Sequence, residues 1–396
     1  MHIPKSTKSS RRKKSPKPYD GFPLTAHPTG RWCKKRHGKL HYFGKVDDWQ
    51  AALERYQRDW PHILEGKTPP PADIGDGCAI AYLCNSFLTS KKNKMESGEL
   101  ASQSFADYYN TCERLVEQFG KDRRVDDLGP NDFESFRKLL AKRYGTVTLK
   151  NEINRCRIVL KYAHDQRLID REVHYGQSFD KPSAKELRRV RNEAGPRLYE
   201  ADEVRRILDA ADPLMRAMVL LGINCGFGNT DCASLPQSAL DLDSGWTNFP
   251  RPKTDIPRRV PLWPETVEAL REAIALRPKP SNPADSDLCF LTIQGNRWVR
   301  TTPSRSNAEK YVTVNTIARR FGALLKNLSI NGRRGIGFYT LRHVFETVAG
   351  ESKDQVAVNA IMGHVDSSMA GVYRERISDE RLRAVVSTVR KWLLGE

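Results

Sequence analysis

Two residues near the C-terminal end of the chain place a possible base and a possible nucleophile at a short spacing. The stretch "MGHVDSSMAGVYRER", residues 362–376, puts His364 nine positions before Tyr373, and Arg374 and Arg376 follow. Taken alone, the histidine could make a structural hydrogen bond, and the tyrosine could be a core-facing aromatic of a short helix. A chemical role therefore depends on which other residues act with this pair.

Arg342 and Lys253 complete a set of side chains suited to phosphoryl transfer. Arg342 lies in "GFYTLRHVFET" (337–347), and Lys253 lies in the proline-rich "PRPKTDIPRRVPL". Arginine binds two phosphate oxygens through its planar fork, lysine can protonate a leaving alkoxide, and histidine can donate to a phosphate oxygen. Tyrosine becomes a nucleophile once a cationic pocket draws off its proton. Because no paired carboxylates suited to Mg²⁺ accompany these residues, we expect no metal site and no cofactor.

The distribution of charge indicates a polyanionic partner. The formal net charge is +18, and residues 1–45 hold thirteen Lys or Arg against one acidic residue, Asp20. Neutralising phosphates with such a segment releases condensed counterions, which favours nucleic acid. The alternative is a basic tail that only improves solubility.

The N-terminal third of the chain predicts a small module between two segments without regular structure. Residues 1–19 are basic and of low complexity, and the Pro/Gly-rich residues 67–77 read as a linker. Between them, "GRWCKKRHGKLHYFGK" (30–45) predicts a two-stranded hairpin, and residues 47–60 predict a helix. The hairpin carries four candidate DNA-binding residues: Lys34, Lys35, Arg36 and Lys39.

Residues 78–177 predict a helical domain. Apolar residues recur at helical spacing over 105–119, 133–140 and 149–163, and Asn131 with Glu134 after Pro130 is typical of a helix start. The polar face of the last helix carries four basic residues, of which Lys150 and Arg157 are the candidate DNA contacts. Basic residues at these positions are equally typical of a helix face that is exposed to solvent and contacts no DNA. The polar residues 178–197 read as an interdomain linker.

From residue 198 to 396 the pattern is mostly helical, with helices expected at 264–276, 313–327, 340–350 and 354–362. Residues 246–263 predict a hairpin that flanks Lys253. The expected fold class is therefore multidomain and mainly α (α+β). The eight cysteines show no zinc-ligand spacing, and no apolar run is long enough for a membrane span, so we expect reduced thiols in the cytoplasm.

The combination of motifs resembles the tyrosine recombinases, or phage-type integrases. Their signature has an arginine box, a GH box and a nucleophilic tyrosine nine residues after that histidine, and here these are "TLRHVF", "IMGH" and "VYRE". The segment around Lys253 is similar to the lysine hairpin of the family. The resemblance covers residues 198–396 as the catalytic domain. More loosely, residues 78–177 resemble the core-binding (SAM-like) domain, and residues 20–66 an arm-type DNA-binding module.

This resemblance implies a site-specific DNA recombinase or integrase. Tyr373 would attack a scissile DNA phosphate to give a 3′-phosphotyrosyl link and a free 5′-hydroxyl, without metal or ATP. Arg342, His364, Lys253 and Tyr339 would form the rest of the site. The partners implied are two double-stranded DNA sites and a homotetramer assembled on them from monomers or weak oligomers, with accessory DNA-bending proteins a further option. Such a protein would be cytoplasmic and nucleoid-associated.

Two positions depart from the family pattern. The first arginine of the family belongs in the box that reads "GFGNTDCASL" here, where Gly228 stands in its place although Asp231 and Leu235 match. The histidine expected three residues before Arg342 is Tyr339, whose phenol can still hydrogen-bond a phosphate. Loss of one charge-stabilising donor costs about a hundredfold or more in rate. The nearby candidates to replace the missing arginine are Arg251, Arg258 and Arg259.

Three functions are compatible with these residues. The first is an active recombinase in which another arginine replaces the missing one. The second is a sequence-specific DNA-binding protein, derived from a recombinase, whose catalysis is attenuated or lost because of Gly228. The third is a type IB topoisomerase, which uses similar residue types, but the short GH-to-tyrosine spacing suits an integrase better.

Overall fold

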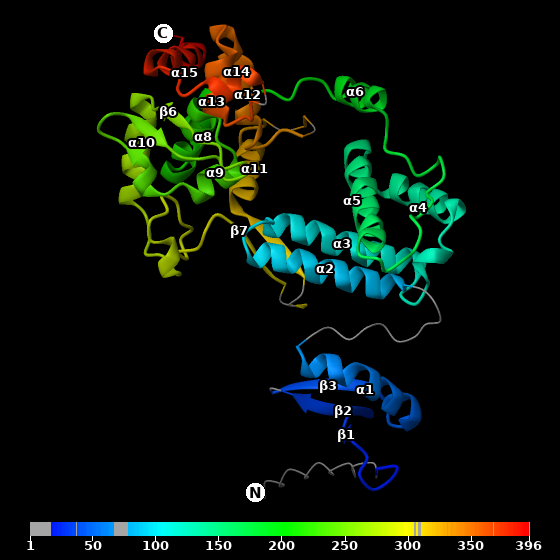
Figure 1. The fold of residues 1–396 in the computed structure, drawn as a ribbon. Coiled ribbons are helices and arrows are strands. Elements are labelled where there is room, and N and C mark those ends of the chain that lie inside the picture. Colours follow the sequence, from blue (N-terminus) through cyan, green and yellow to red (C-terminus); the bar gives the residue numbers. More distant parts are fainter. Residues whose placement is uncertain are drawn as a thin grey trace, which may run out of the picture. The chain divides into compact units, whose positions relative to one another are not determined.

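The structure, a computed structural model, describes residues 17–36, 38–66, 78–304, 306–307, 310–330, 332–333, 335–366 and 368–395 (Figure 1). Most of the predicted basic tail, residues 1–16, and the predicted linker 67–77 lie outside these ranges. The chain divides into two compact units, the first with residues 1–90, 111–143 and 152–180, the second with residues 91–110, 144–151 and 181–396. Helices dominate and the sheets are small, which confirms the expected multidomain, mainly α fold class.

The N-terminal module is a three-stranded antiparallel sheet followed by one helix. The elements are β1 (Thr25–His27), β2 (Arg31–Arg36), β3 (Lys39–Lys45) and α1 (Trp49–Leu64). The helix packs on the sheet so closely that a Cβ on Gly44 would lie 2.9 Å from Cβ of Ala52. The predicted hairpin and helix are confirmed. The strand β1 was missed because three residues are too few to show a period of two.

The helical region that follows contains four long helices, of which the apolar periodicity predicted the last three. They are α2 (Ile80–Glu96), α3 (Ser102–Phe119), α4 (Pro130–Arg143) and α5 (Thr146–Asp165), with the 3₁₀ turn η1 (Val125–Asp127). Most apolar positions of α4 and α5 are buried, although Leu139 and Val147 are exposed, and Glu152 is buried at 1% exposure. Its carboxylate accepts hydrogen bonds from Arg114 at 2.7 Å, Arg155 at 2.8 Å and the hydroxyl of Thr111 at 3.0 Å.

The segment 178–197 is not a plain linker. It contains the helix α6 (Ala184–Glu193), which begins with a capping box between Ser183 and Glu186 and buries none of its residues. Because the helix has no apolar face, its pattern gave no periodic signal. The capping box was the one local sign of it.

The second unit contains the remaining elements. These are the helices α7 (Ala201–Ala210), α8 (Pro213–Cys225), α9 (Asn229–Ser234), α10 (Pro264–Ala275), α11 (Thr316–Asn327), α12 (Thr340–Ala349), α13 (Gln355–Met362), α14 (Met369–Tyr373) and α15 (Asp379–Leu394). The antiparallel sheet has the order β4 (Leu240–Asp241), β5 (Trp246–Asn248), β6 (Arg259–Pro261), and β7 (Val299–Pro303) pairs with β8 (Tyr311–Asn315). Short 3₁₀ turns are η2 (Gln237–Ala239), η3 (Pro283–Asp285) and η4 (Gly350–Ser352).

The predicted helices of this unit are confirmed, with one shifted boundary. The helix expected from residue 313 begins at Thr316, because residues 311–315 form β8 and Asn315 caps the helix. The hairpin around Lys253 is also confirmed, since β5 and β6 pair antiparallel. In the described part of the chain, none of the helices is sufficiently long and apolar to span a bilayer.

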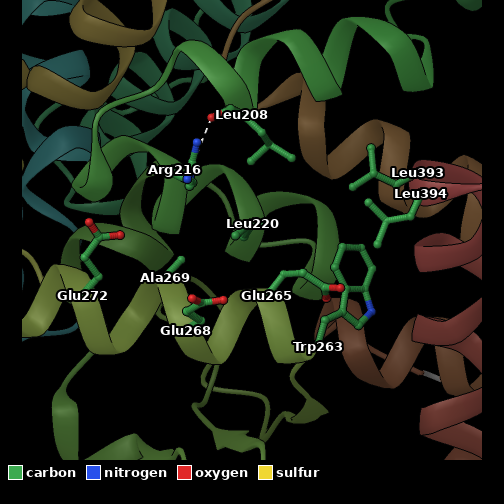
Figure 2. Close-up of a pocket in the computed structure, with 10 residues that line it drawn as sticks. All are labelled: Leu208, Arg216, Leu220, Trp263, Glu265, Glu268, Ala269, Glu272, Leu393 and Leu394. Carbon is green, nitrogen blue, oxygen red and sulfur yellow. Dashed lines mark hydrogen bonds between the residues drawn. The ribbon is translucent and has the colours of Figure 1, made fainter.

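The core of the second unit is built around α8, almost all of which is buried. Helices α7, α10, α12 and α15 contact it (Figure 1). The C-terminal helix α15 is held in place by Trp263, which donates to the carbonyl of Val386 at 3.0 Å, and by Arg390, which pairs with Glu265 at 2.5 Å. A pocket of about 270 Å³ lies between α7, α8, α10 and the end of α15. Figure 2 shows the residues that line it.

Candidate active site

Arg342 lies at the centre of the candidate site, in the first turn of α12 and only 2% exposed. Its Nη1 donates to the carbonyl of Gly226 at 2.6 Å, and its Nη2 donates to the carbonyl of Met362 at 2.6 Å. These carbonyls belong to the C-terminal ends of α8 and α13, where helices leave carbonyl groups unpaired. Arg342 therefore joins two helix ends and holds its cation at a fixed place.

His364 contacts this arginine through one ring nitrogen. Its Nε2 lies 3.3 Å from Nη2 of Arg342, and its Nδ1 lies 3.4 Å from Oδ1 of Asn359. Burial and the charges of Arg342 and Arg251 lower the pKa of His364, although Glu346 opposes them. In the neutral form Nε2 accepts from Arg342, so Nδ1 carries the proton and donates to Asn359. The sequence reasoning missed Asn359, whose only signal was its place one helical turn before His364.

The box around Gly228 is intact apart from the missing arginine. Asp231 accepts the backbone N–H of Gly228 at 2.8 Å and, through its other oxygen, Nη2 of Arg258 at 2.8 Å. The side chain of Arg258 has no solvent exposure and stacks on Phe227, with its Cζ 4.4 Å from the ring centroid. Burial lowers the pKa of Arg258, and the carboxylate of Asp231 opposes this effect. The matching aspartate of the box thus has a structural partner that sequence alone did not identify.

The loop between β5 and β6 reaches the same place. Arg251 donates from Nη1 to the carbonyl of Gly363 at 3.2 Å, and the hydroxyl of Thr254 lies 3.4 Å from the same oxygen. Lys253 is exposed and lies between these two anchors in the chain. Gly363 has φ of 61°, and a Cβ there would lie 2.9 Å from Cδ of Arg258. A glycine before His364 is therefore needed both for its backbone and for the space that it leaves.

Tyr373 ends the short helix α14 and is 74% exposed, so the core-facing alternative is wrong. The N-cap of this helix is Ser368, whose hydroxyl accepts the N–H of Gly371 at 3.1 Å. Asp366 accepts hydrogen bonds from the backbone and hydroxyl of Ser368 and pairs with Arg374 at 2.8 Å. These contacts lower the pKa of Asp366 to about 2. Arg374 is thus committed to a carboxylate rather than free to favour a phenolate.

Gly371 in this helix leaves room for that carboxylate. A Cβ at Gly371 would lie 2.5 Å from Cγ of Asp366. The glycine therefore has a steric reason, in addition to the low helix propensity noted from sequence.

Tyr339 covers the position where the family arginine is absent. Its side chain is 47% exposed, and its ring packs edge-on against His343 at a centroid distance of 5.4 Å. A Cβ on Gly228 would lie 3.0 Å from two ring carbons of Tyr339. The structure therefore places the ring of Tyr339 beside Gly228, the position at which the family arginine is absent.

Of the candidate DNA-binding residues in the N-terminal hairpin, two are exposed and two are engaged within the module. Lys35 and Lys39 are exposed. The ammonium of Lys34 lies 4.6 Å and 4.9 Å from the ring centroids of a tyrosine and a tryptophan of α1, and Arg36 donates to a carbonyl at the end of this helix at 3.0 Å. Lys35 and Lys39 are therefore better placed to meet a phosphate.

The two candidates on α5 differ in the same way. Lys150 is exposed. Arg157 donates to the carbonyl of Phe179 and to the carboxylate of Asp180, both at 2.8 Å, and its Cζ lies 5.0 Å from the ring centroid of Tyr175. Arg157 thus holds the segment after α5, and of these two residues Lys150 is the one whose charge faces solvent.

Comparison with known proteins identifies the family of the second unit. Residues 197–379 match the model of the phage integrase family. A search of curated proteins found no match. Among solved structures, the fold is similar to a lambda integrase tetramer bound to a Holliday junction, with 14% identity, a TM-score of 0.54, and coverage of 92% of this chain and 99% of that one.

A second similar structure is the Tn1549 transposon integrase in complex with transposon right end DNA. It has 14% identity and a TM-score of 0.53, and the match covers 79% of this chain and all of that one (100%). At this identity the likeness shows the fold. The family match shows that residues 197–379 form a phage integrase domain.

Proposed function

We propose that this protein is a site-specific DNA recombinase or integrase that cleaves and rejoins DNA through a 3′-phosphotyrosyl intermediate at Tyr373. One observation carries the proposal: buried Arg342 and His364, with Arg251 beside them, gather on the turn 362–364, nine residues before an exposed tyrosine. Cations held at fixed places and a solvent-accessible phenol are what attack on a phosphodiester requires.

In the first step the phenolic oxygen of Tyr373, an exposed side chain, passes its proton to solvent water and bonds to the scissile phosphorus. The bond from phosphorus to the 5′-oxygen breaks, and Lys253 protonates that oxygen, so that a 5′-hydroxyl is released. Arg342 holds the non-bridging oxygens, on which negative charge develops, and His364 donates to one of them from Nε2 once that nitrogen is protonated. In the reverse step a 5′-hydroxyl of the partner strand displaces the tyrosine. The phosphodiester bond energy stays in the covalent link, so the exchange needs neither ATP nor a metal ion.

The proposed partners are two double-stranded DNA sites. The exposed Lys35 and Lys39 and the basic N-terminal segment would contact one region of DNA, and Lys150 another. The structure of lambda integrase on a Holliday junction is a tetramer. By analogy, we propose that this chain also assembles as a tetramer on DNA, with accessory DNA-bending proteins as an option and nucleoid association in the cell as a consequence.

The alternative is a DNA-binding protein of the same family that has lost catalysis. Gly228 is the observation that favours it, because one charge-stabilising donor of the family site is absent. The retained Arg342, His364, Lys253 and Tyr373 favour the enzyme. An active recombinase and an inactive DNA-binding protein would both bind DNA, but only the recombinase would form a covalent link to it.

Covalent trapping tests the proposal directly. A pool of nicked duplexes of randomised sequence is incubated with the full chain in the presence of a metal chelator. Duplexes that stay bound to the protein in denaturant are then recovered and amplified. The recovered duplex should give a protein–DNA adduct through its 3′-phosphate. Tyr373→Phe is the matched control, because it removes only the hydroxyl of an exposed side chain. This variant should shift the duplex in a native gel and form no adduct.

The other outcomes assign the function differently. An adduct that persists in Tyr373→Phe would place the nucleophile elsewhere. An adduct that forms only with added Mg²⁺ would contradict the metal-free mechanism. Tight binding of a selected duplex with no adduct from the wild type would establish the DNA-binding alternative.

A further inference from the structure

The space into which a side chain at Gly228 would extend is occupied by the aromatic ring of Tyr339, and not by a cation. A Cβ at Gly228 would meet two ring carbons of Tyr339 at 3.0 Å and an oxygen of Asp231 at 3.3 Å. The backbone of Gly228 has φ of −95°, which any residue can adopt. The position therefore tolerates a side chain if the half-exposed ring of Tyr339 yields by a few tenths of an ångström, but in this protein the second cation for a bound phosphate must come from elsewhere.

Three arginines of the β5–β6 hairpin were candidates by sequence, and the structure separates them. Arg259 forms an exposed pair with Asp379 at 2.9 Å and stacks on Trp246, with its Cζ 3.8 Å from the ring centroid. Arg258 is bound to Asp231 and has no exposed side-chain surface. Arg259 is committed to another contact, and Arg258 is enclosed by protein. Neither is placed to receive a phosphate at the surface of the site.

Arg251 is placed differently. It donates to the carbonyl of Gly363, and Arg342 donates to the carbonyl of Met362, so the two guanidinium groups bind consecutive residues whose Cα atoms are about 3.8 Å apart. Burial and, after it, the charge of Arg251 lower the pKa of Arg342. The two cations are thus close enough to repel each other.

The carboxylate of Asp231 opposes this lowering of the Arg342 pKa, but it is itself hydrogen-bonded to Arg258. Within the ranges that the structure describes, no carboxylate forms a salt bridge with Arg251 or Arg342, and Asp231 is bound to Arg258. Arg251 is also only half-buried, and a guanidinium has five N–H donors, of which Gly363 takes one. Two adjacent arginines, one with donors left over, form a site for an anion with several oxygens, such as a phosphodiester.

We propose that Arg251 is the second phosphate-binding arginine of this enzyme and replaces the arginine absent at Gly228. The inference rests on the proposed function. Arg251, from the hairpin between β5 and β6, and Arg342, from α12, bind the non-bridging oxygens of the scissile phosphate. The site therefore keeps two arginines although the family position is empty, and the hairpin supplies a charge-stabilising cation as well as the general acid Lys253.

The test measures adduct formation on the duplex recovered by covalent selection with the wild type. Arg251→Ala and Arg251→Lys should each lower the rate of adduct formation by about a hundredfold or more, because lysine keeps the charge but not the planar fork. Both variants should still shift the duplex in a native gel. Arg259→Ala is the matched control from the same hairpin, and it should react at the wild-type rate.

A second variant tests whether the two positions serve the same phosphate. Gly228→Arg in the Arg251→Ala protein should restore much of the lost rate, since the family position then supplies the missing cation. If the double variant forms the adduct no faster than Arg251→Ala, the proposal that Arg251 replaces the family arginine is overturned. Thermal unfolding midpoints close to the wild type for Arg251→Lys would exclude misfolding as the cause of its lower rate.

The results separate this inference from the proposed function. Wild-type adduct with an unchanged rate in Arg251→Ala would overturn the role of Arg251 and leave the recombinase assignment intact. Absence of adduct from the wild type after selection would overturn both.

Discussion

The buried ion pair between Asp231 and Arg258 makes a prediction about stability that also concerns the site. The side chain of Arg258 has no exposure, and Asp231 is its carboxylate partner at 2.8 Å. Asp231→Ala would leave a buried cation unpaired and the N–H of Gly228 without its acceptor. Loss of one partner of a buried pair costs about 3–5 kcal/mol. Because a protein is stabilised by only about 5–15 kcal/mol, we expect the second unit to be severely destabilised.

The measurement is urea denaturation of the full chain, combined with hydrogen–deuterium exchange over residues 226–235 and 249–258. Exchange resolves the region that carries the pair, which matters because a chain of several units need not unfold in one step. Asp379→Ala is the matched control, since Asp379 pairs with the neighbouring Arg259 but both side chains are nearly half exposed. That pair is screened by solvent, so its loss should change the free energy of unfolding much less than the loss of the buried pair.

A double variant distinguishes the unpaired charge from other losses. Asp231→Ala combined with Arg258→Met removes both charges and should recover part of the stability, because no buried cation is left without a partner. A cost of Asp231→Ala no larger than that of Asp379→Ala would refute the reasoning. The reasoning would also be refuted if the double variant lost as much free energy of unfolding as the two single variants lose together.

Two further predictions concern the rest of the chain. Hydrogen bonds from Arg114 and Arg155 lower the pKa of Glu152 in spite of its burial, so the stability that this carboxylate contributes is present above its pKa in the unfolded chain and is lost as the pH falls through the lower folded value. Glu152→Gln should lower the thermal midpoint at neutral pH and flatten its decline in acid, and an unchanged pH profile would contradict the assignment. Deletion of residues 1–66 should weaken DNA binding and reduce the slope of log affinity against log salt by about 0.9 for each phosphate that the protein no longer neutralises. An unchanged slope in binding titrations would identify the basic segment as a solubility tail.

Most of the helices and the motifs of the site could be predicted from sequence, because both depend on residues that are close in the chain. The buried faces of α3, α4 and α5 follow the apolar period, and α4 begins at Pro130 as the local start signal indicated. The hairpin around Lys253 and the short helix that carries Tyr373 were also expected from local composition. Among the elements that were missed, β1, β4, β7, β8 and α6 are too short or too polar to have a periodic pattern.

The chemical groups of the site and their order along the chain could be established without the structure: the "TLRHVF" and "IMGH" boxes, the tyrosine nine residues later, and the absence of an arginine at Gly228. The role of each basic residue, in contrast, depends on the folded arrangement. Arg258 and Arg259 are neighbours in the chain, yet one is enclosed with Asp231 and the other is exposed beside Asp379. Their carboxylate partners lie 27 and 120 residues away in the chain. The place of Arg251 beside Arg342 was likewise set by packing between segments distant in sequence, which no local pattern records.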